Sequence, residues 1–398
     1  MKKINYGKHF IDISDVNAVK KTLLSSFLTQ GTEVVNFENS LKKYFGSKFC
    51  IAVNSGTSAL YLLALALNWK KNDYIITTPI TFLATSNAIL LNGATPVFVD
   101  VSKDIPNLNP LLVEKKIKQL KKEKKKIKAI IAVDMAGYPC DWKALKKISS
   151  KYKIDLINDN CHAMGSLYEG SKKYAIKYAD YVTHSFHPVK NFTTGEGGAI
   201  HLKKKNIYKK ILSIKNHGIQ PKEFFHNKKP WYYKMNTFGY NFRMSDINCS
   251  LGSSQLLKLD KFINKRIAIA KTYDSFFRQY NFIKVLPRAR NILCSYHLYP
   301  IRVNFNKLKE DKIFLFNYMK SKNINLQVHY IPVYKQPFYK KKFKIKKLTE
   351  AERYYKEALS LPIYYQLSKK EINYIFEQFR VFFNKYKKQI ALKKILNN

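Results

Sequence analysis

Residues 49–69, FCIAVNSGTSALYLLALALNW, combine a short apolar run with a helical pattern of leucines and alanines, joined by a turn of small residues. The first six residues predict a strand, and the stretch from Ser55 predicts a turn that opens a helix. The apolar part of the helix is too short to span a bilayer and predicts a buried helix. A buried strand followed at once by a buried helix is typical of an α/β sheet covered on both faces.

The same alternation continues along the chain. Strand-like apolar runs alternate with helical stretches, and the runs are DYIITTP, TPVFVDV, KAIIAVDM, KIDLINDN, DYVTHSF and GGAIHL. Strands that lack a polar face and are separated by helices predict a mostly parallel central sheet flanked by helices. Near the N-terminus, residues 13–24 predict a helix that Ser14 or Asp15 caps.

The pattern changes after about residue 250. Residues 245–280 predict one long helix that would form a spine between two domains. The remainder mixes a strand, YHLYPIRVNF, with helices at 307–321, 349–358 and 368–387. We therefore predict a large domain over residues 1–250 and a smaller α+β domain over residues 251–398. No Gly/Ser linker separates them, so we expect them to pack together.

The charge raises a different possibility. The chain has 72 basic and 27 acidic residues, a net charge of +45, and so a nucleic-acid-binding protein must be considered. The lysines, however, are spread along the chain, and arginine, which base readout favours, is scarce. The densest run, residues 114–128, is interpreted as one amphipathic helix with a lysine-rich outer face. We expect neither nucleic acid nor a membrane as a partner, although weak attraction for anionic substrates remains open.

Cysteine usage and the N-terminus indicate the compartment. The five cysteines are scattered without a CxxC pair, which argues against a disulfide scaffold or a zinc site and favours a reducing cytosol. The first residues contain no apolar segment of a secretory signal. We therefore expect a cytoplasmic protein without a metal site.

Ligands of open parallel sheets bind beyond the carboxyl ends of the strands, so the residues that follow each strand are candidates. Residues 55–58 offer hydroxyl and N–H groups at a helix N-terminus, which suits a phosphate, although a plain helix cap explains them as well. Asp159 follows an apolar strand, where a buried carboxylate needs a partner, and an ion pair or helix cap is the alternative. His162 lies three residues further on and, taken alone, is more typical of a structural histidine.

Lys190 stands in HSFHPVKNFTTGEGGAI, residues 184–200. Ser185 ends a predicted strand, Pro188 fixes the turn, and TTGEGG is expected to give a flexible backbone with exposed N–H groups. Partial desolvation would lower the pKa of this lysine and supply the neutral amine that Schiff-base chemistry needs. A surface lysine is the default in so lysine-rich a chain. The position favours a catalytic role, because a phosphate-binding turn, a carboxylate and a lysine at strand ends are what pyridoxal phosphate requires.

Five stretches of the chain resemble the DegT/StrS family of pyridoxal-phosphate-dependent nucleotide-sugar aminotransferases. They are NSGTSAL, TTPITFLATSNAIL, NDNCHAMGS, SFHPVKNFTTGEGGAI and GYNFRMSDINCSLGSSQL. The resemblance covers about residues 4–385 and implies the aspartate-aminotransferase-like, type I fold. The opening stretch, residues 4–31, and QVHYIPVY, residues 327–334, are similar to the subgroup of the pseudaminic acid pathway.

The resemblance implies the cofactor pyridoxal 5'-phosphate and a role for each matching residue. Lys190 would form the Schiff base and Asp159 would pair with the pyridine nitrogen. His162 would lie close to the ring, and Phe82 would stack on its other face. The residues implied to hold the phosphate are Thr57, Ser58, Ser185 and, from the neighbouring subunit, Asn241. Those implied to contact the nucleotide sugar are Tyr6, Phe27, Leu28, Thr29, Gln30, Ser55, His329, Tyr330, Ile331 and Pro332.

The implied reaction transfers an amino group from L-glutamate to the 4-keto carbon of a UDP-linked 2-acetamido-2,6-dideoxy-hexos-4-ulose. Lys190 would move the proton in both halves of the reaction, in a homodimer with shared sites. The HPVK form favours this subgroup, whereas Asp134 stands where many relatives carry histidine. Two alternatives stay open: a sibling aminotransferase acting on another nucleotide-linked keto sugar, and a non-catalytic regulatory or nucleic-acid-binding protein of the same fold.

Overall fold

A seven-stranded sheet forms the centre of the computed structural model, which describes residues 2–220 and 229–396, with side chains up to residue 384. Only β8 runs antiparallel to its neighbours β1 and β7, and the other strands are parallel. The predicted mostly parallel sheet is thus confirmed. In spatial order the strands are β1 (Phe49–Val53), β8 (Gly198–Leu202), β7 (Tyr181–Ser185), β5 (Asp155–Asp159), β4 (Lys126–Val133), β2 (Asp73–Thr77) and β3 (Thr95–Phe98).

Helices cover both faces of this sheet, as the apolar strands require. In β1, Ile51 and Val53 pack in one buried cluster with α3, whereas Cys50 and Ala52 pack in another with α2. Successive residues of a strand point to opposite faces, so both faces are buried. The helices on the first side are α3 (Gly56–Ala66), α4 (Leu83–Leu91) and α8 (Lys205–Ile214), and those on the second are α2 (Thr32–Phe45), α5 (Pro110–Lys122), α6 (Trp142–Tyr152) and α7 (Tyr174–Tyr178).

Two local predictions were wrong. The lysine-rich run 114–128 is not one helix, because α5 ends at Lys122 and β4 already begins at Lys126. The helix α1 (Ile13–Leu23) is capped by Asp12, not by Ser14 or Asp15. The Asp12 carboxylate accepts from the backbone N–H groups of Ser14 and Asp15. The Asp15 carboxylate in turn accepts from the backbone N–H of Asp12, and this reciprocal pair is a capping box.

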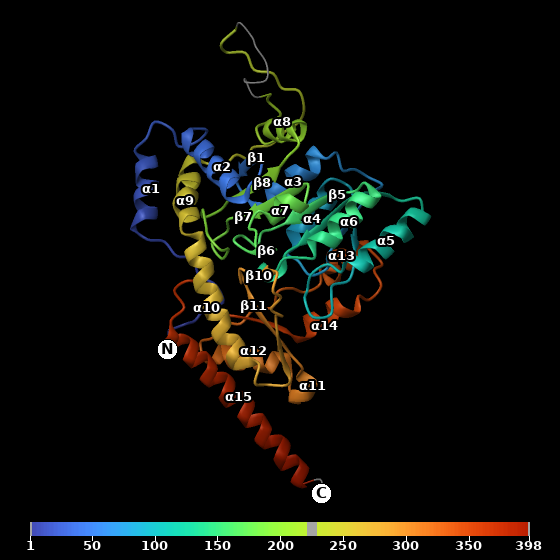
Figure 1. Ribbon diagram of the computed structural model, residues 1–398, viewed down its shortest axis with the longest axis vertical. Coiled ribbons are helices and arrows are strands. Elements are labelled where there is room, and N and C mark those ends of the chain that lie inside the picture. Colours follow the sequence, from blue (N-terminus) through green and yellow to red (C-terminus); the bar gives the residue numbers. More distant parts are fainter. Residues whose placement is uncertain (1, 221–228, 397–398) are drawn as a thin grey trace.

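The predicted spine consists of two helices, α9 (Asp246–Leu257) and α10 (Leu259–Phe277), divided at Lys258. Figure 1 shows α10 running from the central sheet toward a second sheet, β12-β11-β9, which is antiparallel. Its strands are β9 (Ile283–Val285), β11 (Tyr299–Val303) and β12 (Ala358–Leu361), and a separate pair joins β10 (Ile292–Leu293) to β6 (Leu167–Tyr168).

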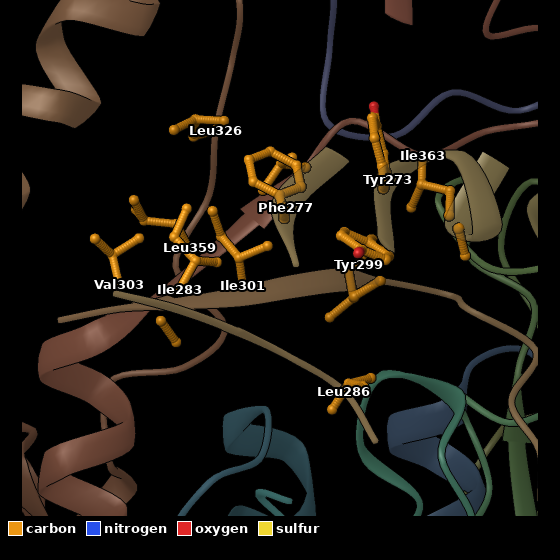
Figure 2. Packing of buried hydrophobic residues seen from close by; sticks show 14 of the residues in the cluster. Tyr273, Phe277, Ile283, Leu286, Tyr299, Ile301, Val303, Leu326, Leu359 and Ile363 are labelled. Carbon is orange, nitrogen blue, oxygen red and sulfur yellow. The ribbon is translucent and has the colours of Figure 1, made fainter. Parts of the chain in front are cut away.

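The C-terminal half has a hydrophobic core of its own. Tyr273 and Phe277 of α10 pack against Tyr299 and Ile301 of β11 and against Leu359 of β12 (Figure 2). Met135 and Tyr138 also contribute to this core and tie it to the rest of the chain, so the division near residue 250 stays a prediction. The remaining elements are η1 (Met135–Gly137), α11 (Phe305–Leu308), α12 (Lys312–Ser321), η3 (Val333–Lys335), α13 (Pro337–Lys342), α14 (Thr349–Glu357) and α15 (Lys369–Leu396).

None of the helices over residues 2–220 and 229–396 combines the length and the apolar character that crossing a bilayer demands.

Candidate active site

The carboxyl ends of the parallel strands open into one cavity of about 630 Å³. Because β1, β2, β5 and β7 are parallel, the residues that follow them meet at the same edge of the sheet. Ser55, Thr81, Asp159 and Ser185 line the cavity from these strand ends. Residues 327–331 close it from the C-terminal half.

The N-terminus of α3 forms one wall. Ser55 caps this helix, with its Oγ accepting the backbone N–H of Ser58 at 3.0 Å. The N–H groups of the first helical turn have no partner within the helix, so those of Gly56 and Thr57 can hold an anion. A side chain on Gly56 would place Cβ 2.6 Å from Ser185 Cβ, so glycine lets the helix end sit against β7.

Asp159 forms the floor of the cavity. Its side chain is only 4% exposed, and its Oδ2 accepts the hydroxyl of Thr85 at 2.7 Å. The other oxygen, Oδ1, accepts the backbone N–H of Cys161 at 3.3 Å. Thr85 is held in turn by the hydroxyl of Thr81, 2.8 Å away. A buried carboxylate that faces a cavity in this way is suited to pair with a protonated ligand nitrogen.

Lys190 lies on the loop between β7 and β8. Its neighbours fix the loop: the Asn191 side chain donates to Met164 O at 2.7 Å, and Phe192 is buried. Burial lowers the pKa of the Lys190 ammonium, and the negative charge of Asp159 opposes this only in part. The lowered pKa favours the neutral amine that nucleophilic chemistry needs.

The TTGEGG stretch differs from its predicted form. Thr193 and Thr194 are buried, and the N–H of Thr194 donates to Phe186 O at 3.0 Å, so the backbone is tied down instead of lying open. A Cβ on Gly198 would come within 2.5 Å of Ser55 O. This glycine therefore allows β8 to approach the cap of α3, and its close contact is with the protein backbone.

Four histidines, His162, His187, His297 and His329, line the cavity together with Tyr330. The His162 and His297 rings lie 4.4 Å apart between centroids, and His162 Nε2 lies 3.3 Å from Tyr330 Oη. Burial, reinforced by the charge of Lys190, holds the pKa of His162 and of His329 below the ordinary value, that of His329 at about 3. The rings of His162, His297 and His329 are therefore neutral near pH 7.

Most of the sequence-predicted residues meet in this cavity. Those that line it are Tyr6, Ser55, Thr57, Phe82, Asp159, His162, Ser185, Lys190, His329, Tyr330 and Ile331. Ser58 is turned away, since its hydroxyl donates to Asn54 Oδ1 at 2.6 Å. Pro332 lies just beyond the lining residues, where it begins η3.

Two predicted segments lie outside the cavity of this chain. Residues 27–30 lead into α2, with Leu28 O accepting the N–H of Asp246 at 2.9 Å and Phe27 62% exposed. Asn241 is exposed on a segment that pairs with Asn216. An exposed Asn241 is available to a second copy of the chain, so its predicted role across a subunit boundary stays a prediction.

Sequence reasoning missed several lining residues, among them Thr85 and His297. Thr85 stands in the first turn of α4, where a hydroxyl near a strand end was a usable signal. His297 begins the segment that enters β11, and its approach to His162 joins positions 135 residues apart. No pattern of neighbouring residues in the sequence predicts a contact over this separation.

The residues fit pyridoxal phosphate. A helix N-terminus suits the phosphate, a buried carboxylate suits the pyridine nitrogen, and a half-buried lysine of lowered pKa suits the aldehyde, all in one cavity. On a mostly parallel sheet covered by helices, this set defines an aminotransferase of the type I fold.

The chain belongs to the DegT/DnrJ/EryC1/StrS aminotransferase family, whose sequence pattern matches residues 10–380. The UDP-4-amino-4,6-dideoxy-N-acetyl-beta-L-altrosamine transaminase of Campylobacter jejuni is 38% identical over 373 residues, 94% of this chain and 95% of the relative. The Helicobacter pylori protein of that name is 33% identical, covering 96% and 100% of the two chains.

Solved structures agree with this assignment. Helicobacter pylori PseC, described as an aminotransferase involved in the biosynthesis of pseudoaminic acid, superposes with a TM-score of 0.88 at 32% identity, covering 96% of this chain and 100% of PseC. The PLP form of a putative sugar aminotransferase from Streptococcus pneumoniae gives a TM-score of 0.86 at 28% identity, covering 96% and 99% of the two chains. The expected family and fold are thus confirmed, as is the expected aminotransferase class, and the alternative of a non-catalytic protein loses its support.

Proposed function

We propose that this aminotransferase uses pyridoxal phosphate to move an amino group from L-glutamate to the 4-keto carbon of a UDP-linked 2-acetamido-2,6-dideoxy-hexos-4-ulose. The product would be UDP-4-amino-4,6-dideoxy-N-acetyl-β-L-altrosamine. The observation that carries the proposal is the meeting of Lys190, Asp159 and the N-terminus of α3 in one cavity. The names of the relatives at 38% and 33% identity support this particular sugar.

The cofactor, when bound, supplies an electron sink for charge on the substrate carbon. The N–H groups of Gly56 and Thr57 and the hydroxyl of Ser185 would hold its phosphate. Asp159, fixed by Thr85, would keep its pyridine nitrogen protonated. Phe82 stands 57% exposed at the rim, where its ring face is available for stacking.

Lys190 would carry the proton at its Nζ. The lowered pKa favours the neutral amine, which can take a proton from the donor's α-carbon and return one to the sugar carbon. His162, His297 and His329 do not compete for the proton near pH 7, because burial lowers their pKa values. The loop bond from Asn191 to Met164 O keeps the lysine in place during both steps.

A homodimer would complete the site. Asn241 is exposed, and the resemblance assigns it to the phosphate of a neighbouring subunit. If it acts across the boundary, mixing an Asn241→Ala chain with a Lys190→Ala chain restores one complete site per mixed dimer. Activity of the mixture above that of either variant supports the shared site, and its absence counts against it.

The test of the proposed function has two parts. Purified protein should show the visible absorbance of bound pyridoxal phosphate, and borohydride should abolish it and attach the cofactor to the peptide that contains Lys190. A panel of UDP-, GDP- and dTDP-linked 4-keto and 3-keto sugars with L-glutamate then identifies the substrate by product analysis. Preference for another nucleotide or a 3-keto sugar would favour the sibling aminotransferase. Purified protein without the visible absorbance of the cofactor would contradict the proposal.

A further inference from the structure

His162 and Tyr330 face each other across the wall of the cavity. Tyr330 Oη lies 3.3 Å from His162 Nε2, and the two rings are nearly parallel, at 30°, with centroids 6.1 Å apart. Both side chains line the cavity that contains Lys190. Which of the two atoms donates the hydrogen depends on where His162 carries its proton.

The backbone of Ala136 determines the position of that proton. Its N–H donates to His162 Nδ1 at 3.4 Å. A ring nitrogen that accepts a hydrogen bond carries no hydrogen, so a neutral His162 has its hydrogen on Nε2. Burial and the charge of Lys190 hold the pKa of His162 well below its ordinary value, so the ring stays neutral. Nε2 therefore donates and Tyr330 Oη accepts.

This direction frees the hydrogen of Tyr330. A phenol hydrogen lies near the ring plane and has two favourable positions, and His162 occupies one of them with its own donor. Within the described residues His162 is the hydrogen-bond partner of Tyr330 Oη, and none accepts from it. Burial raises the pKa of Tyr330, so the hydroxyl keeps its hydrogen. A donor remains in the cavity wall for a ligand oxygen.

The direction of the Ala136 N–H is itself fixed from several sides. Ala136 has a left-handed backbone, φ 60°, and its carbonyl accepts the N–H of Leu298 at 3.4 Å. The next carbonyl, that of Gly137, accepts the Ser166 hydroxyl at 2.7 Å and the N–H of Ser295 at 3.1 Å. Non-glycine residues keep such a conformation only where their surroundings hold it.

We propose that Tyr330 donates this hydrogen to the carbonyl oxygen of the keto substrate, and that His162 and Ala136 position it for this purpose. The inference rests on the proposed function. As an amine nitrogen bonds to the carbonyl carbon, the π electrons move onto the oxygen, and the hydrogen bond stabilises the charge that develops there. The hydrogen of Tyr330 stays on Oη. The oxygen leaves later as water, with both hydrogens taken from the incoming amine.

The first experiment compares Tyr330→Phe with Tyr334→Phe in the holoenzyme. Tyr334 is the matched control, because it lies four residues further on and its hydroxyl donates to Glu352 Oε1 at 2.9 Å, outside the cavity. We expect Tyr330→Phe to lower kcat about 100-fold, while KM and the cofactor absorbance stay within about threefold. Tyr334→Phe should keep kcat within about threefold. An unchanged kcat in Tyr330→Phe overturns the proposal, and so does an equal loss of cofactor binding.

The second experiment reads the hydrogen bond without turnover. The infrared carbonyl stretch of a UDP-linked 4-keto sugar labelled with carbon-13 at the keto position is measured on the Lys190→Ala holoenzyme. The stretch should shift to higher wavenumber when Tyr330→Phe is added, and an unchanged stretch contradicts the hydrogen bond. If wild-type protein aminates no keto sugar at all, the proposed function fails, which is a separate result.

The positioning role of His162 is tested with two substitutions. A glutamine amide can still donate near the position of Nε2, whereas leucine cannot. We expect His162→Gln to keep kcat within about tenfold of the wild type and His162→Leu to fall to the level of Tyr330→Phe. The carbonyl stretch should follow the same order. Equal kcat values for the two His162 variants would remove His162 from the mechanism.

Discussion

The hydroxyl of Thr85, in the first turn of α4, donates to Asp159 Oδ2 across 2.7 Å, and it joins two elements that are 74 residues apart. The bond orients a carboxylate that is otherwise enclosed by the ends of the sheet. A positioned carboxylate needs no rearrangement when it meets a protonated nitrogen, so the contact contributes to cofactor affinity.

Thr85→Val tests this relationship, because valine keeps the shape and removes the donor. We expect the dissociation constant of pyridoxal phosphate to rise about tenfold to 100-fold, measured by absorbance titration of cofactor-free protein. Thr81→Val is the control, since Thr81 bonds to Thr85 and not to Asp159, and its effect should be smaller. Equal effects of the two substitutions would show that the pair acts through packing alone.

Lys190 should make the stability of the cofactor-free protein depend on pH. Burial lowers its folded-state pKa, and so between that pKa and 10.5 the unfolded chain binds more protons than the folded one. The free energy of unfolding therefore rises with pH through this window. Lys190→Met should stabilise the protein at pH 7, and the gain should shrink as pH approaches 10.5.

Urea unfolding of both proteins at several pH values measures this difference. Lys369→Met, on the exposed side of α15, is the control and should change little at any pH. Lys190→Met should also lower transamination by about 1000-fold or more, because the proton carrier is lost. A gain in stability that is the same at every pH would contradict the assigned burial of the charge.

Gly198 is predicted to be intolerant of a side chain. An added Cβ would lie 2.5 Å from Ser55 O and 2.7 Å from Gly56 N, so β8 or the cap of α3 must move. Gly198→Ala should lower the free energy of unfolding by about 1–3 kcal/mol and weaken phosphate binding at the same helix end. Gly7→Ala is the control, since its nearest contact would be an ordinary 3.6 Å to Val189 Cβ. If Gly198→Ala keeps the cofactor affinity of the wild type, the packing of β8 does not determine phosphate binding, which contradicts the prediction.

The parts of the site that sequence could predict are those that follow strands. The sequence could place Asp159 and Lys190 at one edge of the sheet, because an apolar run predicts a strand and the carboxyl ends of parallel strands share one edge. The contact of His162 with Tyr330 was out of reach, since it joins residues 168 positions apart and depends on the backbone of Ala136. The prediction of one helix over the lysine-rich run was wrong because the helical spacing of its residues continues through residues 123–125. In the structure these residues form a turn, after which β4 pairs with β2.

Asp246 shows how a distant residue shapes a segment that the sequence assigned to the substrate. Its carboxylate is 1% exposed and accepts the N–H of Gly31 at 2.8 Å and of Glu33 at 2.9 Å, so it caps α2 from a position 215 residues away. Residues 27–30 precede this cap, and their course depends on it. Negative charge at a helix N-terminus is stabilising, and unpaired buried N–H groups are costly.

Asp246→Ala should therefore lower the free energy of unfolding by about 2–4 kcal/mol, measured by urea unfolding. Asp246→Asn keeps an acceptor and should lose about half as much. Asp104→Ala is the control, because its carboxylate is 58% exposed and its ion-pair partner, Lys284, is exposed too. If residues 27–30 contact the nucleotide sugar, Asp246→Asn should also raise KM for that substrate and leave cofactor affinity unchanged. A stability loss with unchanged KM would confine Asp246 to the cap and argue against the predicted contacts.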